Sequence, residues 1–168
     1  MIIITTNKGV VMDFIDFKLL SLLLKNGRVT HTEVAQQLQL SIPAVTERIK
    51  KLEKAAIIQG YTVSLDYQQL GFALTAVVFV TLDHPQYRAH FIQEMQAAGE
   101  VLECLHMTGD DDYMLKIVCL NAKHLDYFLS ERIKSIQGIM RTRTMIVLSA
   151  PKERSVDIPE IIKEGLKQ

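Results

Sequence analysis

The stretch LQLSIPAVTERIKKLEKAAII, residues 38–58, decides how the first third of the chain is expected to fold. Ser41 is a good helix N-cap, and Pro43 suits the first turn of a helix, where its missing N–H removes no hydrogen bond. Beyond them, Ile49 and Leu52 continue an apolar face at helical spacing, which leaves the opposite face free to be polar. The stretch therefore predicts a tight turn followed by an amphipathic helix.

Two shorter helical patterns precede this stretch. Residues 13–25 place Ile15 and Leu19 at the start of one apolar helix face, and Thr30 and Glu33 have the spacing of a capping box. Two short helices joined by a tight turn, the second of them amphipathic, make a helix-turn-helix candidate. The major groove of DNA admits one α-helix, whose first turns present side chains to the base edges.

Polar and basic side chains gather on the side of these helices that a core does not need. Those in the first turns would read bases, and the basic ones further along would meet phosphates, which supply sequence-independent affinity. The candidate DNA contacts are Thr30, Thr32, Ser41, Ile42, Pro43, Ala44, Thr46, Glu47, Arg48, Lys50, Lys51 and Lys54. A basic, solvated helix of a small bundle explains the same pattern without DNA, and periodicity alone favours that interpretation.

The hydrophobic period changes after residue 57. Residues 74–82, LTAVVFVTL, form a near-continuous apolar and β-branched run that is typical of a buried strand. The patterns from there predict the order strand, helix, strand, strand, helix, strand, which is the βαββαβ order of a ferredoxin-like α+β sandwich. We therefore expect an N-terminal arm or extension over 1–12, a helix-turn-helix domain of winged-helix-like type over 13–56, an extended linker over 57–71, a ferredoxin-like domain over 72–149 and a tail over 150–168.

Composition and charge narrow the class of protein. The 168 residues are 48% hydrophobic and 23% charged, which is ordinary for a folded domain. The formal net charge is +0, yet residues 13–61 carry seven basic and five acidic side chains, whereas residues 62–168 carry eleven and fourteen. This small asymmetry agrees with two modules that have different partners. No apolar run is long enough for a membrane span and no signal peptide is evident, so we expect no membrane partner.

The chain shows no pattern of catalytic or metal-ligating residues. Its two cysteines, Cys104 and Cys119, fall in strand-like segments, which predicts free buried thiols in a reducing cytosol and leaves a disulfide between them as the alternative. Cys104 and His106 share one face of a predicted strand without matching a zinc-ligand spacing. Phosphate-binding loops and nucleophile elbows are also missing from the sequence. We therefore expect a cytoplasmic protein that is not an enzyme and has no metal or cofactor.

The segment LLKNGRVTHTEVAQQLQLSIPAVTERIKKLEKAAIIQGY resembles the helix-turn-helix of the leucine-responsive regulator/AsnC family, the feast/famine transcription regulators. GDDDY at 109–113 is similar to the Gly-Asp-x-Asp turn of that family. The resemblance implies a regulator that binds double-stranded DNA. It also implies effector domains that pair across their sheets into homodimers, join further in many members into octamers, and bind amino acids or related metabolites between dimers.

Three positions depart from the family's pattern. Ala56 stands where the family usually has glycine just before the aliphatic pair that ends the recognition helix, and Asp111 stands where the turn commonly has a bulky residue. Met12 stands where family members often begin, so residues 1–11 are expected to be either an arm or an upstream start.

The acidic turn is the expected effector site. The backbone N–H groups of a glycine-containing turn can hold a carboxylate, and an aspartate can accept bonds from an ammonium group, so together they suit a free amino acid. A plain surface hairpin or a cation site explains the same residues without an effector. Under the resemblance, the candidate effector-binding residues are His106, Thr108, Gly109, Asp110, Asp111, Asp112 and Tyr113.

Two rival functions remain open at this point. The first is an enzyme on the same scaffold, because haem-pathway (siroheme-type) decarboxylases resemble this family. In such an enzyme, the candidate residues for contacting an acidic tetrapyrrole would be His84, His90, Arg141 and Arg143. The second rival is a metabolite-sensing assembly protein that does not bind DNA.

Overall fold

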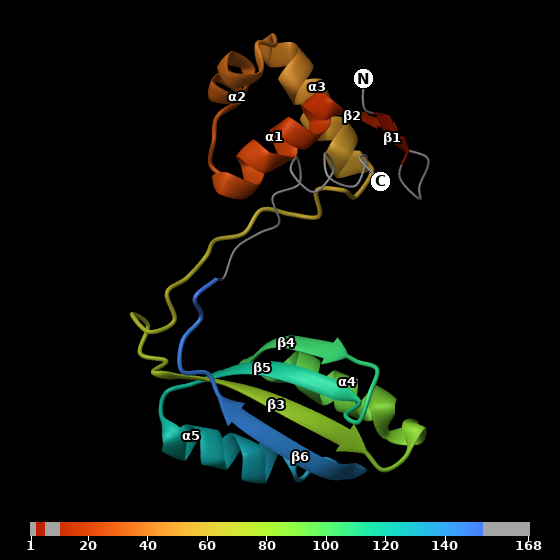
Figure 1. The fold of residues 1–168 in the computed structure, drawn as a ribbon, viewed down its shortest axis with the longest axis vertical. Coiled ribbons are helices and arrows are strands. Elements are labelled where there is room, and N and C mark those ends of the chain that lie inside the picture. The colour runs from red at the N-terminus through yellow and green to blue at the C-terminus, as the bar shows by residue number, and fades with distance from the viewer. Residues whose placement is uncertain (1–2, 6–10, 153–168) are drawn as a thin grey trace. The chain divides into compact units, whose positions relative to one another are not determined.

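The computed structural model describes residues 3–5 and 11–152. They form two compact units, one ending at Ser64 and the other beginning at Leu65 (Figure 1). The expected N-terminal extension and C-terminal tail lie largely outside the described residues. Within the described ranges, every helix is too short or too polar to cross a lipid bilayer.

The N-terminal unit, called the head below, contains a two-stranded ribbon and three helices. In chain order its elements are β1 (Ile3–Thr5), β2 (Val11–Asp13), α1 (Phe14–Lys25), α2 (His31–Leu38) and α3 (Ile42–Lys54). The strands pair antiparallel, with Ile4 opposite Met12. The sequence patterns predict the three helices and miss the ribbon, because three-residue strands are too short to show an alternating pattern.

Capping side chains start α2 and α3 where the sequence predicts. The Thr30 hydroxyl accepts a hydrogen bond from the Glu33 N–H at 3.2 Å, and the Glu33 carboxylate accepts one from the Thr30 N–H at 2.7 Å, so the predicted capping box is confirmed. The Ser41 hydroxyl accepts a bond from the Ala44 N–H at 3.3 Å, and Pro43 lies in the first turn of α3. These bonds satisfy N–H groups that the helix itself leaves without partners.

Left-handed residues end the same two helices. Gln39 in the turn after α2 and Ala56 after α3 both have φ of 54°. At the end of α3 the Ile57 N–H donates to the Leu52 carbonyl at 2.9 Å, and the Ala56 N–H donates to the Glu53 carbonyl at 2.9 Å. This bonding pattern is a Schellman motif, whose left-handed position glycine usually fills. Ala56, which stands where the family usually has glycine, therefore keeps the left-handed backbone of the motif and adds a Cβ atom at that position.

The apolar stripes of the three helices form one core. Leu19 of α1, Val34 of α2, and Val45 and Leu52 of α3 are completely buried, and Met12 of β2 packs into the same cluster. Because these residues take the inner faces of α2 and α3, the outer faces and the turn between the two helices stay on the surface, as a helix-turn-helix requires.

The second unit, called the sandwich below, has the predicted βαββαβ order. Its elements are β3 (Leu74–Leu82), η1 (Pro85–Tyr87), α4 (Arg88–Ala97), β4 (Val101–His106), β5 (Tyr113–Cys119), α5 (Ala122–Tyr127), η2 (Phe128–Ile133) and β6 (Ile139–Ile146). The four strands make an antiparallel sheet in the order β4-β5-β3-β6. This order confirms the ferredoxin-like α+β sandwich.

The helices cover one face of this sheet (Figure 1). Phe91 of α4 and Phe128 of η2 are fully buried against Val78 and Leu115 of the central strands. The residues that alternate with these point to the opposite face, which no helix of the sandwich covers. Within the described chain both cysteines are free thiols; Cys119 is buried as the sequence predicts, whereas Cys104 is only half-buried.

Candidate nucleic-acid interface and effector turn

The start of α3 and the start of α2 present the predicted DNA contacts on the surface of the head. Most of the side chains are exposed, and only Ala44, Thr46 and Arg48 are half-buried. Ile42 is 47% exposed although it is a large apolar residue. An exposed aliphatic group in the first turn of a groove-entering helix suits contact with a thymine methyl group.

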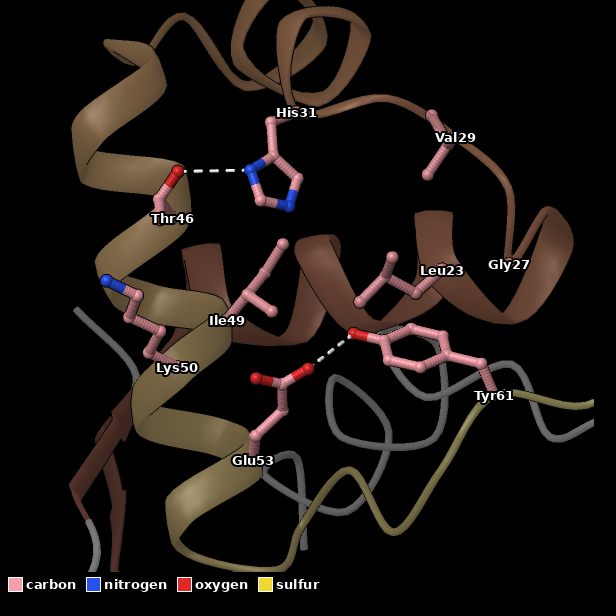
Figure 2. Close-up of a pocket in the computed structure, with 9 residues that line it drawn as sticks. All are labelled: Leu23, Gly27, Val29, His31, Thr46, Ile49, Lys50, Glu53 and Tyr61. Atoms are coloured by element: carbon pink, nitrogen blue, oxygen red, sulfur yellow. Dashed lines mark hydrogen bonds between the residues drawn. The ribbon is translucent and has the colours of Figure 1, made fainter.

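A hydrogen bond joins α2 to α3 at this surface. His31 Nδ1 lies 3.0 Å from the Thr46 hydroxyl, which also bonds the Ile42 carbonyl at 3.0 Å (Figure 2). Because a hydroxyl has one proton and gives it to the Ile42 carbonyl, His31 Nδ1 must carry the proton of the other bond. The sequence analysis omits His31, since nothing in its spacing shows that α2 and α3 bring it next to Thr46.

Arg48 differs from the other predicted DNA contacts because it has two acidic partners within the head. Its guanidinium bonds both carboxylate oxygens of Asp13, at 2.9 and 3.0 Å, and also bonds Asp16, whose side chain is fully buried. Lys51 joins the cluster through Asp16 at 3.3 Å and the Val11 carbonyl at 2.6 Å. Both cations therefore bond to β2 and the start of α1 and tie α3 into the head; Arg48 is half-buried there, whereas the side chain of Lys51 stays 43% exposed.

The charge cluster also shifts the acid–base properties of its members. Burial opposes ionisation of Asp13, yet the hydrogen bond from Arg48 and its positive charge outweigh burial, so the pKa of Asp13 lies below its usual 3.8. Burial likewise opposes the charge on Arg48, but the bonds to Asp13 and Asp16 outweigh it and raise the pKa of Arg48. Each group therefore stabilises the charged form of the other.

Lys50, Lys51 and Lys54 of α3 are all exposed, and Lys51 differs from the other two because it bonds Val11 and Asp16. Lys50 lies 3.5 Å from Glu47, and both side chains are more than half exposed, so this ion pair is weak and easily exchanged for a phosphate. Ile42, Lys50 and Lys54 are thus exposed on α3 near half-buried Thr46, and His31 lies beside Thr46.

A pocket of about 390 Å³ lies beside α3 in the head, and His31, Thr46 and Lys50 also line it (Figure 2). Leu23 and Ile49 line its apolar part, and Tyr61 forms a wall from the segment that follows α3. The Tyr61 hydroxyl donates to Glu53 at 3.0 Å. Burial and this carboxylate together raise the pKa of Tyr61. The bond fixes the start of the chain segment after α3 against the helix.

The turn between β4 and β5 holds its three acidic residues in three different ways. Asp111 is 7% exposed and bonds Arg143 at 2.7 Å, Arg141 at 3.2 Å and Thr81 at 3.2 Å. The hydrogen bond from Arg143 is the largest cause that lowers the pKa of Asp111. The side chain of Asp112 accepts a bond from the Leu82 N–H at 2.7 Å.

Asp110 differs from its two neighbours. It is exposed, and its carboxylate has no hydrogen bond or ion pair with any described residue, while its carbonyl accepts a bond from Arg141 at 3.2 Å. Gly109 beside it has φ of 125°, a backbone conformation that side chains rarely adopt. The structure therefore gives Asp111 and Asp112 supporting contacts within the turn, and it leaves Asp110, Gly109 and exposed Thr108 facing solvent.

His106 and Tyr113 lie opposite each other at the base of this turn, on β4 and β5. Their ring centroids are 5.1 Å apart, and His106 Nδ1 lies 3.3 Å from Arg88 Nη2. Tyr113 is 2% exposed and packs on Phe91, so it lies in the core, unlike Thr108, Gly109 and Asp110 of the predicted effector site, which are exposed.

The candidate residues of a tetrapyrrole-binding enzyme do not form one site in the structure. His84 caps η1 through the Gln86 N–H, and His90 faces Glu94 at 4.0 Å on the surface of α4. Arg141 and Arg143 bind Asp111 instead. In the part of the chain that the structure describes, no three His, Cys, Asp or Glu residues form a group that could hold a metal ion.

Two family models match the chain in the order of its two units. One, described as winged helix-turn-helix DNA-binding, matches residues 12–59, and the other, described as Lrp/AsnC ligand binding domain, matches residues 75–157. The Bkd operon transcriptional regulator of Pseudomonas aeruginosa is 33% identical over 146 residues, which are 86% of this chain and 95% of that protein.

Solved structures give the same likeness. A transcriptional regulator of Neisseria meningitidis in complex with L-Met superposes with a TM-score of 0.83 at 28% identity, covering 86% of this chain and 94% of that one. AsnC of Escherichia coli superposes with a TM-score of 0.82 at 26% identity, covering 88% and 99%.

Proposed function

Because the chain belongs to the Lrp/AsnC family of DNA-binding transcription regulators, we propose that it binds operators through α3 and responds to an amino acid held at the turn between β4 and β5. The family is one of regulators and not of enzymes, so the decarboxylase alternative is set aside. The observation that carries the proposal is the outer face of α3, where an apolar residue, a hydroxyl and two exposed cations follow one another from the first turn.

Each of these side chains has a role in reading DNA. Ile42 and Thr46 would meet base edges in the major groove, and Lys50 and Lys54 would meet phosphates along the groove. His31, fixed by Thr46, would lie where the start of α2 approaches the DNA backbone. Arg48 and Lys51 would act indirectly, by setting the angle of α3 against α1 and β2.

A homodimer would pair two sandwiches through the open faces of their sheets. On this face Phe79 lies opposite Met114, and Val77 lies opposite Met145. Met145 is 46% exposed and Leu105, next to Met114, is 47% exposed. Lys116, opposite Val77, and Arg143, opposite Phe79, lie among these apolar residues, so the proposed interface combines apolar and basic groups. Two heads joined in this way would read two half-sites, as dimeric helix-turn-helix proteins do.

The effector would bind at Gly109 and Asp110. The related regulator of Neisseria meningitidis was crystallised with L-Met, which supports an amino acid as the ligand class here. Asp110 would bind the ammonium group, and backbone N–H groups of the turn would bind the carboxylate. A ligand between dimers favours dimer or octamer only as far as its affinity differs between these assemblies.

Selection of genomic DNA fragments by the purified protein tests the DNA half of this proposal. We expect recovered fragments to share paired half-sites, and Lys50→Ala to weaken binding while it lowers the salt slope by about one. Recovery of unrelated fragments by both proteins would overturn the DNA half of the proposal.

Calorimetry with a panel of amino acids tests the effector half. Asp110→Asn should abolish a binding signal that Asp126→Asn, on the surface of α5, preserves.

A further inference from the structure

The hydroxyl of Thr46, on the helix that we assign to DNA reading, already has two partners within the head. It lies 3.0 Å from the Ile42 carbonyl oxygen. It also lies 3.0 Å from His31 Nδ1 (Figure 2). A carbonyl carries no proton, so the hydroxyl donates to Ile42 and accepts from His31. The only proton of this hydroxyl is therefore engaged inside the protein.

This arrangement limits how Thr46 can contact a base. A hydroxyl whose proton is engaged cannot donate to the acceptor atoms that guanine, adenine and thymine present in the major groove. The Cγ2 methyl group makes no hydrogen bond, and Thr46 is half-buried, so part of its side chain reaches solvent. A threonine methyl group suits contact with the C5 methyl group of thymine.

His31 selects the orientation of the Thr46 side chain. Threonine in a helix divides between two rotamers, because its hydroxyl can bond the carbonyls of the preceding turn. His31 is the first residue of α2 and meets Thr46 across 15 positions of the chain. Its Nδ1–H stabilises the rotamer whose hydroxyl faces α2, and the methyl group then takes the other direction.

We propose that Thr46 recognises a thymine through its methyl group and not through its hydroxyl, and that His31 is the positioning residue that holds it in this orientation. The inference rests on the proposed binding of DNA through α3, and it adds which chemical group of Thr46 reads the base. It also gives the contact between α2 and α3 a role in specificity.

Deoxyuridine in place of thymidine tests the methyl contact, because it lacks only the C5 methyl group. Half-sites are first selected from random DNA by the unaltered protein, and each thymine is then replaced in turn. We expect a thymine in each half-site whose replacement weakens binding about fourfold, the effect of one methyl-sized apolar contact.

Substitutions of Thr46 separate its methyl group from its hydroxyl. Thr46→Ser keeps the hydroxyl and removes the methyl group, so it should bind thymine and deoxyuridine equally well at that position. Thr46→Val keeps a methyl group and removes the hydroxyl, so it should show the same penalty for deoxyuridine as the unaltered protein. Thr32→Ser is the matched control at an exposed position of α2, and it should leave the penalty unchanged.

Substitutions of His31 test the positioning role. Leucine cannot donate a hydrogen bond, so in His31→Leu both rotamers of Thr46 are populated and the penalty should fall to about twofold. The amide of asparagine can donate in place of Nδ1, so His31→Asn should keep the full penalty. A merely structural role of His31 would change stability or overall affinity and leave the ratio between thymine and deoxyuridine as it is.

The results that overturn this inference differ from those that overturn DNA binding. The inference is overturned if no thymine shows a penalty that depends on Thr46, if Thr46→Ser keeps the penalty, if Thr46→Val loses it, or if His31→Leu leaves it undiminished. In each of these cases the selected half-sites still support DNA binding. If the unaltered protein selects no common half-site, the proposed function fails and the inference fails with it.

Discussion

Replacing Arg48 by Met should destabilise the head and leave the electrostatics of DNA binding unchanged. Methionine keeps an apolar stem of similar length and removes only the guanidinium and its charge. Arg48 makes a two-pronged contact with Asp13, where the two side chains are 25% and 30% exposed, and a further bond with fully buried Asp16. The two carboxylates set the size of the effect in different ways.

The loss can be estimated from exposure. A surface ion pair is worth about 1 kcal/mol at most, which describes the Asp13 contact. Removing one partner of a buried pair costs about 3–5 kcal/mol, but Asp16 keeps Lys51 at 3.3 Å, so about half of that is expected there. The sum is about 2–3 kcal/mol of unfolding free energy for Arg48→Met. Asp16→Asn in the same background should reduce the cost of Arg48→Met to about 1 kcal/mol.

Two assays measure this prediction. Urea denaturation gives the stability of each variant, and a double-mutant cycle over Arg48 and Asp16 gives the coupling between them. Equilibrium DNA binding at several salt concentrations, under conditions where each protein is folded, gives the salt slope. Arg48→Met should keep the slope of the unaltered protein, and Lys50→Met should lower it by about one. Unchanged stability together with a slope lowered by about one in Arg48→Met would refute the reasoning, because Arg48 would then meet a phosphate.

Three further predictions follow from the structure. Ala56→Gly should stabilise the head by about 0.5–1 kcal/mol in urea denaturation, because glycine removes the strain of the left-handed backbone. Ala55→Gly, at a right-handed position, should destabilise the head. A loss of stability in Ala56→Gly would contradict the geometry. Met145→Glu on the open sheet face should weaken dimerisation at least about a hundredfold, as measured by sedimentation. Met140→Glu is the control, because Met140 lies on the same strand and is 71% exposed, and it should not weaken dimerisation. If the two variants dimerise equally well, the interface lies elsewhere. The pKa of Asp111 in the folded protein lies below its usual 3.8, so the carboxylate stabilises the sandwich above that pH, and this stabilisation is lost as the pH falls through the lower folded value. Asp111→Asn should therefore flatten the acid dependence of the free energy of sandwich unfolding. An unchanged pH profile in this variant would rule out the Asp111 contribution.

The sequence predicts well those features that depend on neighbouring residues. The capping box of Thr30 and Glu33, the N-cap at Ser41 and the strand at 74–82 are each specified within a short window. Their order along the chain then determines the ferredoxin-like topology, because few connections satisfy it.

Features that depend on distant residues are missed for a physical reason. Arg48 meets Asp13 across 35 positions, and Asp111 meets Arg143 across 32. A helical face or a turn pattern shows that such a side chain is polar, but it does not show which opposite charge the fold brings to it. The pairing of His31 with Thr46 and the burial of Tyr113 are missed in the same way.

Chemical protection of a selected operator tests the central claim, that α3 enters the major groove. Dimethyl sulfate methylates guanine N7, an atom exposed in the major groove, and bound protein should protect it where α3 lies. We expect protection at two half-sites whose centres are about 10 base pairs or a multiple apart, and its loss for Ile42→Asp. Protection that is absent from the major groove, or that Ile42→Asp leaves intact, would contradict the account.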